Sequence, residues 1–198
     1  MGLLSGVYQA FSPLWDKLYE KRRNEAEKRI LPFSGLAGCR YCLVRCVRED
    51  AAPGRELAQR LHLVTELAAA YPDMVFVLSG RPAVKPREGS DRRPRPADPD
   101  LAARYLEDQG LPARRLVLDD QGWSVFRSIL SWQHLKLPAR YVVLAAPSEL
   151  VRAFHCARHL GMDPSLLTDP PGTMSLPPAD AKEKAAFAAD VLQCLFNI

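Results

Sequence analysis

The stretch from residue 141 to residue 161 constrains the fold of this chain most strongly. Residues 141–145 read Tyr-Val-Val-Leu-Ala, an apolar run short enough to be a buried strand. After a break in the pattern, Ser148 is a candidate N-cap, and apolar residues recur at helical spacing up to Gly161, a helix-ending residue. A strand, a tight turn and a helix in this order predict a ligand crevice at the carboxyl edge of an open parallel sheet.

The rest of the chain repeats this alternation of strand and helix. Short apolar runs predict further strands at 40–47, 74–78, 115–118 and 166–168, and helical spacing predicts helices near 57–68, 101–110, 124–132 and 178–196. Repeated crossovers of this length favour parallel strands. The sequence therefore predicts an α/β fold, a three-layer doubly wound and mostly parallel sheet of Rossmann-like type, with an extra N-terminal helix.

Residues 1–38 stand apart from the α/β domain expected over 39–198. They contain an amphipathic helix, and its segment 16–29 carries six basic and four acidic residues. Such a helix docks on a protein partner or an anionic membrane surface through residues 7–30, or it covers a flank of its own domain. Because no secretion signal or membrane-spanning run is recognisable, we expect a cytoplasmic protein, with attachment to the periphery of the inner membrane as the alternative.

The cysteines and histidines give no strong metal motif. An odd number of cysteines, five, predicts reduced thiols buried as small apolar residues. The pair Cys39 and Cys42 lacks the second Cys/His pair of a zinc site, so no metal is predicted. His155 and His159 are four residues apart on an expected helix, and we interpret them as a surface pair. Neither a Walker motif nor GxGxxG follows the first strand, so the cofactor is unknown.

The charge of the chain argues against nucleic acid as the main partner. The formal net charge is only +4. The segment 81–95 has six basic and two acidic residues, among several prolines and without aromatic residues for base stacking. This basic loop is suited to steering a phosphorylated ligand or an acidic protein partner.

Candidate site residues follow the carboxyl ends of the predicted strands, where a doubly wound sheet binds its ligand. They are Arg48, Glu49 and Asp50, then Ser79, Gly80 and Arg81, then Asp119 and Asp120, and finally Ser148, Glu149 and Arg152. Glu149 and Asp119 are the catalytic candidates, with Glu149 as a general base or a hydroxyl partner. The planar guanidinium groups of Arg81 and Arg152 suit a phosphate or carboxylate.

Several segments over about residues 39–197 together resemble the YdcF/SanA/ElyC family, a bacterial family of unknown function. They are Arg60 with Glu66 and Leu67, residues 75–80 and 98–110, residues 118–120 with the expected helix start near Ser124, and residues 142–148 and 152–161, in this order. The resemblance implies a Rossmann-like domain that binds a small anionic or nucleotide-like ligand and is linked to envelope processes. The residues that it carries over as ligand-binding candidates are Arg60, Ser79, Gly80, Asp98, Ser148 and Arg152.

The chain also departs from the family pattern. Residues 45–48 replace the glycines that follow the first strand, and Glu149 replaces a histidine. Ser124, Phe126 and Arg127 stand where the family has Thr, Glu and Asn. Two hypotheses follow: a ligand-binding or enzymatic domain, or a diverged non-catalytic scaffold that acts through the N-terminal helix and the basic loop.

Overall fold

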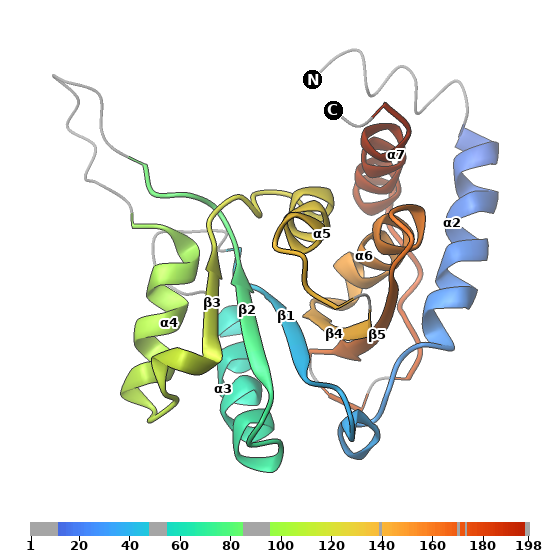
Figure 1. The fold of residues 1–198 in the computed structure, drawn as a ribbon. Helices are drawn as coiled ribbons and strands as arrows, with labels where there is room; N and C mark the ends of the chain where they lie inside the picture. The colour runs from blue at the N-terminus through green and yellow to red at the C-terminus, as the bar shows by residue number, and fades with distance from the viewer. Residues whose placement is uncertain are drawn as a thin grey trace, which may run out of the picture.

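The centre of the molecule is a five-stranded sheet in the order β3-β2-β1-β4-β5 (Figure 1). The computed structural model describes residues 12–47, 55–84, 96–138, 140–169, 171–172 and 174–196. Within these ranges every neighbouring pair of strands is parallel. The strands are β1 (Tyr41–Arg45), β2 (Val75–Ser79), β3 (Leu116–Asp119), β4 (Arg140–Ala145) and β5 (Asp163–Thr168).

Helices cover both faces of the sheet, which confirms the three-layer, doubly wound, Rossmann-like fold (Figure 1). One face is covered by α3 (Arg55–Ala70) and α4 (Asp98–Asp108), and the other by α5 (Val125–His134), α6 (Pro147–His159) and α7 (Ala181–Phe196). Short 3-10 turns occupy Phe33–Leu36 and Ala113–Arg115. The sheet separates two apolar cores, one under each helical layer.

The central strands are apolar without interruption because both of their faces are covered. In β1, Leu43 faces the α5–α6 layer and Cys42 faces the α3–α4 layer. In β2, Val77 faces the α5–α6 layer and Phe76 faces the α3–α4 layer. This alternation matches the period of two of a strand. Such strands read as continuous hydrophobic runs in the sequence.

Two local predictions need correction. The N-cap of α6 is Ala146 and not Ser148, because Pro147 lacks an N–H and has a fixed φ, and so takes the first helical position. The last strand begins at Asp163, earlier than expected. Its Pro164 interrupts the strand signal, and proline is tolerated there because β5 lies at the edge of the sheet.

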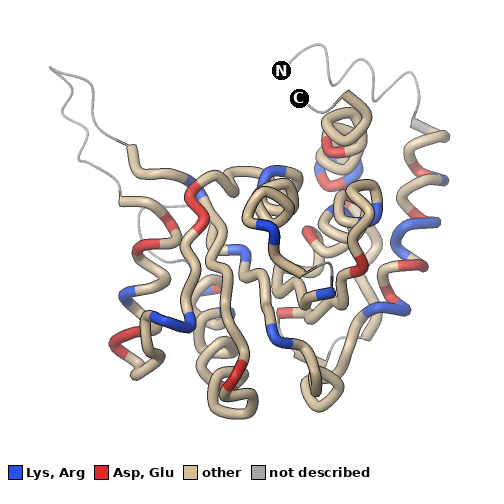
Figure 2. Tube along the Cα trace, viewed as in Figure 1, with Lys and Arg blue, Asp and Glu red and all other residues tan. Residues whose placement is uncertain are grey.

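Helix α2 (Ser12–Glu27) packs against its own domain. Trp15 and Tyr19 are buried beside α6 and α7, and Tyr19 packs edge-on against Phe187 at 5.2 Å. The Tyr19 hydroxyl donates to Glu183 at 2.7 Å. Acidic and basic residues are interleaved along α2 (Figure 2). A partner or membrane would therefore meet this charged side rather than Trp15 and Tyr19.

None of the helices in the described ranges combines the length and the apolarity needed to cross a membrane.

Candidate functional site

The strand order changes direction between β1 and β4, and a pocket lies beside the carboxyl ends of these two strands. The chain leaves β1 towards α3 on one face and leaves β4 towards α6 on the other (Figure 1). The pocket has a volume of about 320 Å³. Its charged lining residues are Arg60, Arg152 and Lys182, with Glu56, Glu149, Asp180 and Glu183. We call it the switch-point pocket.

Arg60 is fixed at the inner end of this pocket by two contacts. Its Nη1 donates to the carbonyl oxygen of Arg45 at 2.6 Å, and its Nε lies 3.1 Å from an oxygen of Asp169. Both side chains of this ion pair are almost fully buried. Burial raises the pKa of Asp169, although Arg60 acts in the opposite direction. The guanidinium is therefore held in one orientation before any ligand arrives.

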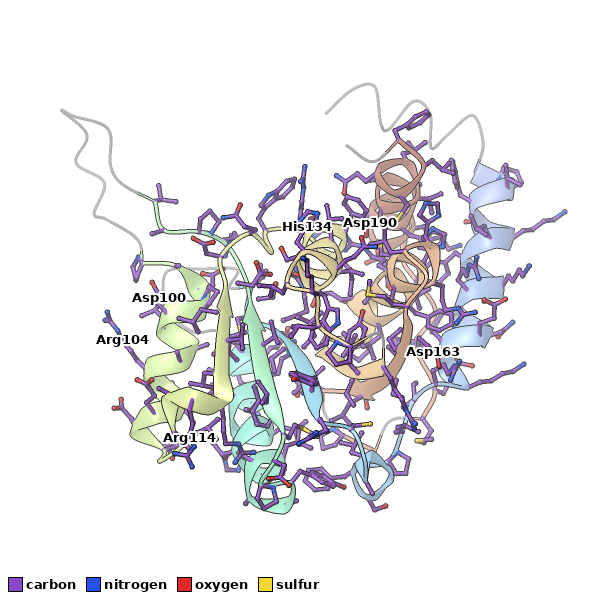
Figure 3. All side chains as sticks on the ribbon, viewed as in Figure 1. Asp100, Arg104, Arg114, His134, Asp163 and Asp190 are labelled. Carbon is purple, nitrogen blue, oxygen red and sulfur yellow. The ribbon has the colours of Figure 1, made fainter. Side chains whose placement is uncertain are left out.

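Arg152 projects from α6 and pairs with a buried carboxylate on α7. Its Nε donates to Asp190 at 2.5 Å, and the Asp190 side chain is 3% exposed. Figure 3 shows Asp190 on α7, the helix that also supplies Lys182 to the pocket. The ion pair joins α6 to α7 and positions the Arg152 guanidinium at the pocket wall.

Glu149 is the pocket carboxylate that lies closest to buried positive charge. Its Oε1 lies 3.2 Å from Nη2 of Arg45. Burial raises the pKa of Glu149, but Arg45, Arg60 and Arg152 together outweigh it and leave the pKa below its usual value. Glu149 is therefore ionised at neutral pH. It accepts hydrogen bonds well, whereas its low pKa makes it a weak general base at that pH.

A buried polar network centred on Arg45 lies beneath Glu149. The Arg45 side chain is 3% exposed, and its Nη1 donates to the carbonyl oxygen of Gly122 at 2.6 Å and to Ser128 at 2.5 Å. The Ser128 and Ser79 hydroxyls lie 2.6 Å apart, and Ser79 donates to Asp119 at 2.6 Å. This network connects β1, β2, β3 and α5.

Gly122 is required by the packing of this network. A Cβ at this position would lie 1.8 Å from the Ser79 hydroxyl, 2.6 Å from the Ser128 hydroxyl and 3.0 Å from Asp119. A side chain therefore cannot be accommodated without moving the serines. The turn that contains Gly122 closes over Ser79 and Asp119.

Gly80, Arg81 and Asp98 form a separate cluster between β2 and α4. Asp98 is fully buried and accepts from the backbone N–H of Arg81 at 3.2 Å and from its Nε at 3.0 Å. A Cβ on Gly80 would lie 2.7 Å from the Asp98 Cβ. These contacts attach the start of α4 to the end of β2, and none of the three residues lines the switch-point pocket.

The structure thus brings only some of the predicted site residues together. Arg60, Ser148, Glu149 and Arg152 line the pocket together. Ser79 and Asp119 lie in the buried network, and Asp120 is exposed to solvent. The Asp119 carboxylate also accepts a hydrogen bond from the backbone N–H of Gln121 at 3.0 Å. Asp119 is therefore a part of the turn and not of the pocket wall. Arg48, Glu49 and Asp50 lie outside the described residues, as does the basic loop over 85–95.

Sequence reasoning missed the residues that hold the site in place. They are Arg45, Gly122, Ser128, Asp169 and Asp190. Two of them carry a recognisable signal. Arg45 ends a strand that is otherwise apolar, and Asp190 interrupts the apolar stripe of the last helix; a charge in a buried pattern requires a partner.

The donor set is suited to a polar organic ligand. In the part of the chain that the structure describes, no group of three or more His, Cys, Asp or Glu side chains is arranged to hold a metal ion. The pocket lining combines cationic donors with carboxylate acceptors. Such a lining is complementary to a molecule with both an anionic group and hydroxyl groups.

Comparison with protein-family models, with curated protein sequences and with solved structures gave no match.

Proposed function

We propose that the protein is a diverged YdcF/SanA/ElyC-like domain that binds a small phosphorylated molecule, such as a nucleotide or a sugar phosphate, in the switch-point pocket. The single observation that supports this most is the joint presence of Arg60, Arg152 and Glu149 on the wall of a pocket at the carboxyl edge of β1 and β4. Open α/β sheets bind their ligands at this point of the strand order.

The size and position of the pocket support a small ligand. A volume of about 320 Å³ lies at the lower end of the range for small-molecule sites. The amino end of α6 lies at its wall, with Ser148 and Glu149 in the first turn. The helix dipole favours an anion at such a position.

We expect different lining residues to contact different groups of the ligand. Arg152 and Lys182 are the donors for a phosphoryl group, and Lys182 is exposed on the first turn of α7. Glu149, held as a carboxylate by the neighbouring arginines, is an acceptor for a sugar hydroxyl. This division also accounts for acidic side chains in a pocket proposed for an anion.

Binding without catalysis fits this geometry best. Glu149 has a lowered pKa, and Asp119 is engaged by Ser79 and Gln121 in the buried network. The two carboxylates predicted as catalytic residues therefore do not face one ligand from opposite sides. The family resemblance adds a link to bacterial envelope processes, which we retain as part of the proposal.

Isothermal titration calorimetry tests the proposal with a nucleoside monophosphate, a sugar phosphate, the unphosphorylated nucleoside and inorganic phosphate. We expect saturable binding of a phosphorylated compound and much weaker binding of the nucleoside. Lys182→Ala removes one phosphate contact and should weaken binding about tenfold. Lys17→Ala, an equally exposed lysine on α2, is the matched control and should leave affinity unchanged. Absence of binding by both phosphorylated compounds contradicts the proposal.

One observation favours the second candidate function, a non-catalytic scaffold or partner-binding module. Arg60 and Arg152 are already paired with Asp169 and Asp190, so the charges of the two pocket arginines are balanced within the protein. A scaffold predicts that the panel of ligands gives no binding. It also predicts that charge reversal at the exposed Lys21 of α2, or at the exposed Lys28 in the turn after α2, weakens association with a partner or an anionic vesicle.

A further inference from the structure

A second pocket lies at the opposite end of α6 from the switch-point pocket. It has a volume of about 530 Å³ and is lined by Leu130, Gln133, His134, His159, Leu160 and Cys194. These residues come from the last turns of α5, α6 and α7 and from the residue after α6. The thiol of Cys194 therefore has access to a pocket although the residue is only 5% exposed.

Cys194 has a second thiol as its neighbour. Cys156 on α6 is fully buried, and both cysteines are free thiols in the core between α6 and α7. The side chains of Cys156 and Cys194 interact electrostatically across the contact between α6 and α7. Two neighbouring thiols on packed helices can be joined by a disulfide where their Cα atoms lie within about 7 Å of each other.

The imidazole of His155 is the third member of the cluster. His155 is 6% exposed, and neither of its ring nitrogens has a hydrogen-bond partner among the described residues. The prediction of a surface pair is therefore wrong for His155, whereas His159 is exposed. The ring centroids of His155 and His159 lie 6.5 Å apart, and the ring centroid of Phe187 lies 5.2 Å from that of His155. An imidazole beside a thiol stabilises the thiolate when it donates a hydrogen bond to the sulfur or carries a proton.

We propose that Cys194 and Cys156 form a peroxide-sensitive dithiol site, in which Cys194 reacts first and Cys156 completes a disulfide between α6 and α7. In the first step the Cys194 thiolate attacks one oxygen of a hydroperoxide. The O–O bond breaks, the sulfur becomes a sulfenic acid, and the second oxygen leaves with a proton as water or an alcohol. In the second step Cys156 attacks that sulfur, which releases water and leaves the disulfide.

The electrostatics of the cluster agree with this order. The neighbouring Cys156 thiol lowers the pKa of Cys194 most, and His155 and His159 lower it further against the effect of burial, to about 6. The pKa of Cys156 is raised by the Cys194 side chain and by burial. Asp190 on α7 also faces this cluster, and His134 on α5 faces the pocket (Figure 3). Cys194 lines the pocket and Cys156 does not, so a hydroperoxide in the pocket meets Cys194 first.

The remaining cysteines provide an internal control. Cys42 and Cys46 are fully buried in the core on the other face of the sheet. Burial raises the pKa of Cys42, and it raises that of Cys46 to about 12. At pH 7 we expect Cys194 to react with iodoacetamide at least about a hundredfold faster than these two thiols, because the thiolate is the reacting form.

Peptide mapping of the full chain after one equivalent of hydrogen peroxide tests the proposal. We expect a disulfide between the tryptic peptides 153–158 and 185–198, which hold Cys156 and Cys194, while Cys42 and Cys46 stay reduced. Cys156→Ser should instead leave a sulfenic acid on Cys194 that a dimedone reagent traps. Equal oxidation of Cys42 and Cys194, or oxidation of Cys194 in the full chain without any link to Cys156, overturns the proposal.

The pH profile of Cys194 alkylation tests the role of His155 as a positioning residue for the thiolate. The profile of the unaltered chain should have its midpoint near pH 6. His155→Gln should move the midpoint upwards, and His134→Gln, which alters the opposite pocket wall, should leave it in place. A midpoint near that of an ordinary thiol in the unaltered chain overturns the proposal, even if the His155 variant fails to fold.

Discussion

The hydroxyl of Ser79 donates a hydrogen bond of 2.6 Å to Asp119, and this bond joins the carboxyl ends of β2 and β3. Ser79 is fully buried and Asp119 is 6% exposed. Both were expected at a ligand site because each ends a strand. Their mutual bond, with Ser128 and Arg45 behind it, makes them part of the support beneath the switch-point pocket.

Gly122→Ala should destabilise the fold by about 3 kcal/mol, because the added methyl group overlaps the Ser79 hydroxyl. Urea unfolding at equilibrium measures the change. Gly35→Ala is the control, since its added Cβ would meet only the Pro32 ring, at 3.2 Å, and Leu31. The packing described for Gly122 is wrong if the two variants have the same free energy of unfolding.

Arg45→Met should cost about 3 kcal/mol of stability. The substitution keeps the volume of the side chain but leaves Glu149 and the carbonyl oxygen of Gly122 without their partner. Arg40→Met, just before the same strand and exposed, should change the free energy of unfolding by no more than about 0.5 kcal/mol. If Arg45→Met lowers the free energy of unfolding by less than about 0.5 kcal/mol, the network contributes little to stability.

Glu149→Gln should cost stability at pH 7 and progressively less as the pH falls below 4.5. The pKa of Glu149 in the folded protein lies below its usual value of 4.5, so its ionised form stabilises the fold. By linkage, this contribution is complete above the unfolded-state pKa and is lost as pH falls through the folded-state pKa. Urea unfolding of both proteins across pH 3 to 7 measures the difference. A difference that grows towards acid pH is the opposite of the expected result.

Arg152→Leu should be more destabilising than the double variant Arg152→Leu, Asp190→Leu. The single change leaves the Asp190 carboxylate buried and unpaired, at a cost of about 3 kcal/mol. The double change removes both charges and retains the contact between α6 and α7. A double-mutant cycle by thermal or urea unfolding gives the coupling energy. Additive losses would show that the ion pair contributes no coupling.

The layers of the fold could be predicted from the sequence because the short apolar runs of the strands and the helical spacing of apolar residues are both clear in it. Residues 141–145 and 75–78 are apolar throughout, and only a strand covered on both faces has that pattern. The start of α6 was misassigned since Pro147 and Ser148 both fit the first turn of a helix. Proline took the position that its ring geometry favours.

The site could be predicted only in part, for a physical reason. Topology alone places Ser148, Glu149 and Arg152 at the carboxyl edge of β4. The predicted positions of the strand and the helix are therefore enough to identify them as site residues. Which charges pair across elements depends on three-dimensional contacts between residues far apart in the sequence. Arg45 meets Glu149, and Arg152 meets Asp190, at distances that no local pattern encodes.

The most direct measurement of the proposed function is an amide chemical-shift titration of the isotope-labelled full chain with a nucleoside monophosphate and, separately, a sugar phosphate. We predict saturable shifts at Ser148, Glu149 and Lys182, the pocket residues at the starts of α6 and α7, and none at Gly110. If neither compound produces saturable shifts, or if the shifts gather at Gln133 and His159 instead, the switch-point pocket does not bind a phosphorylated ligand of this kind.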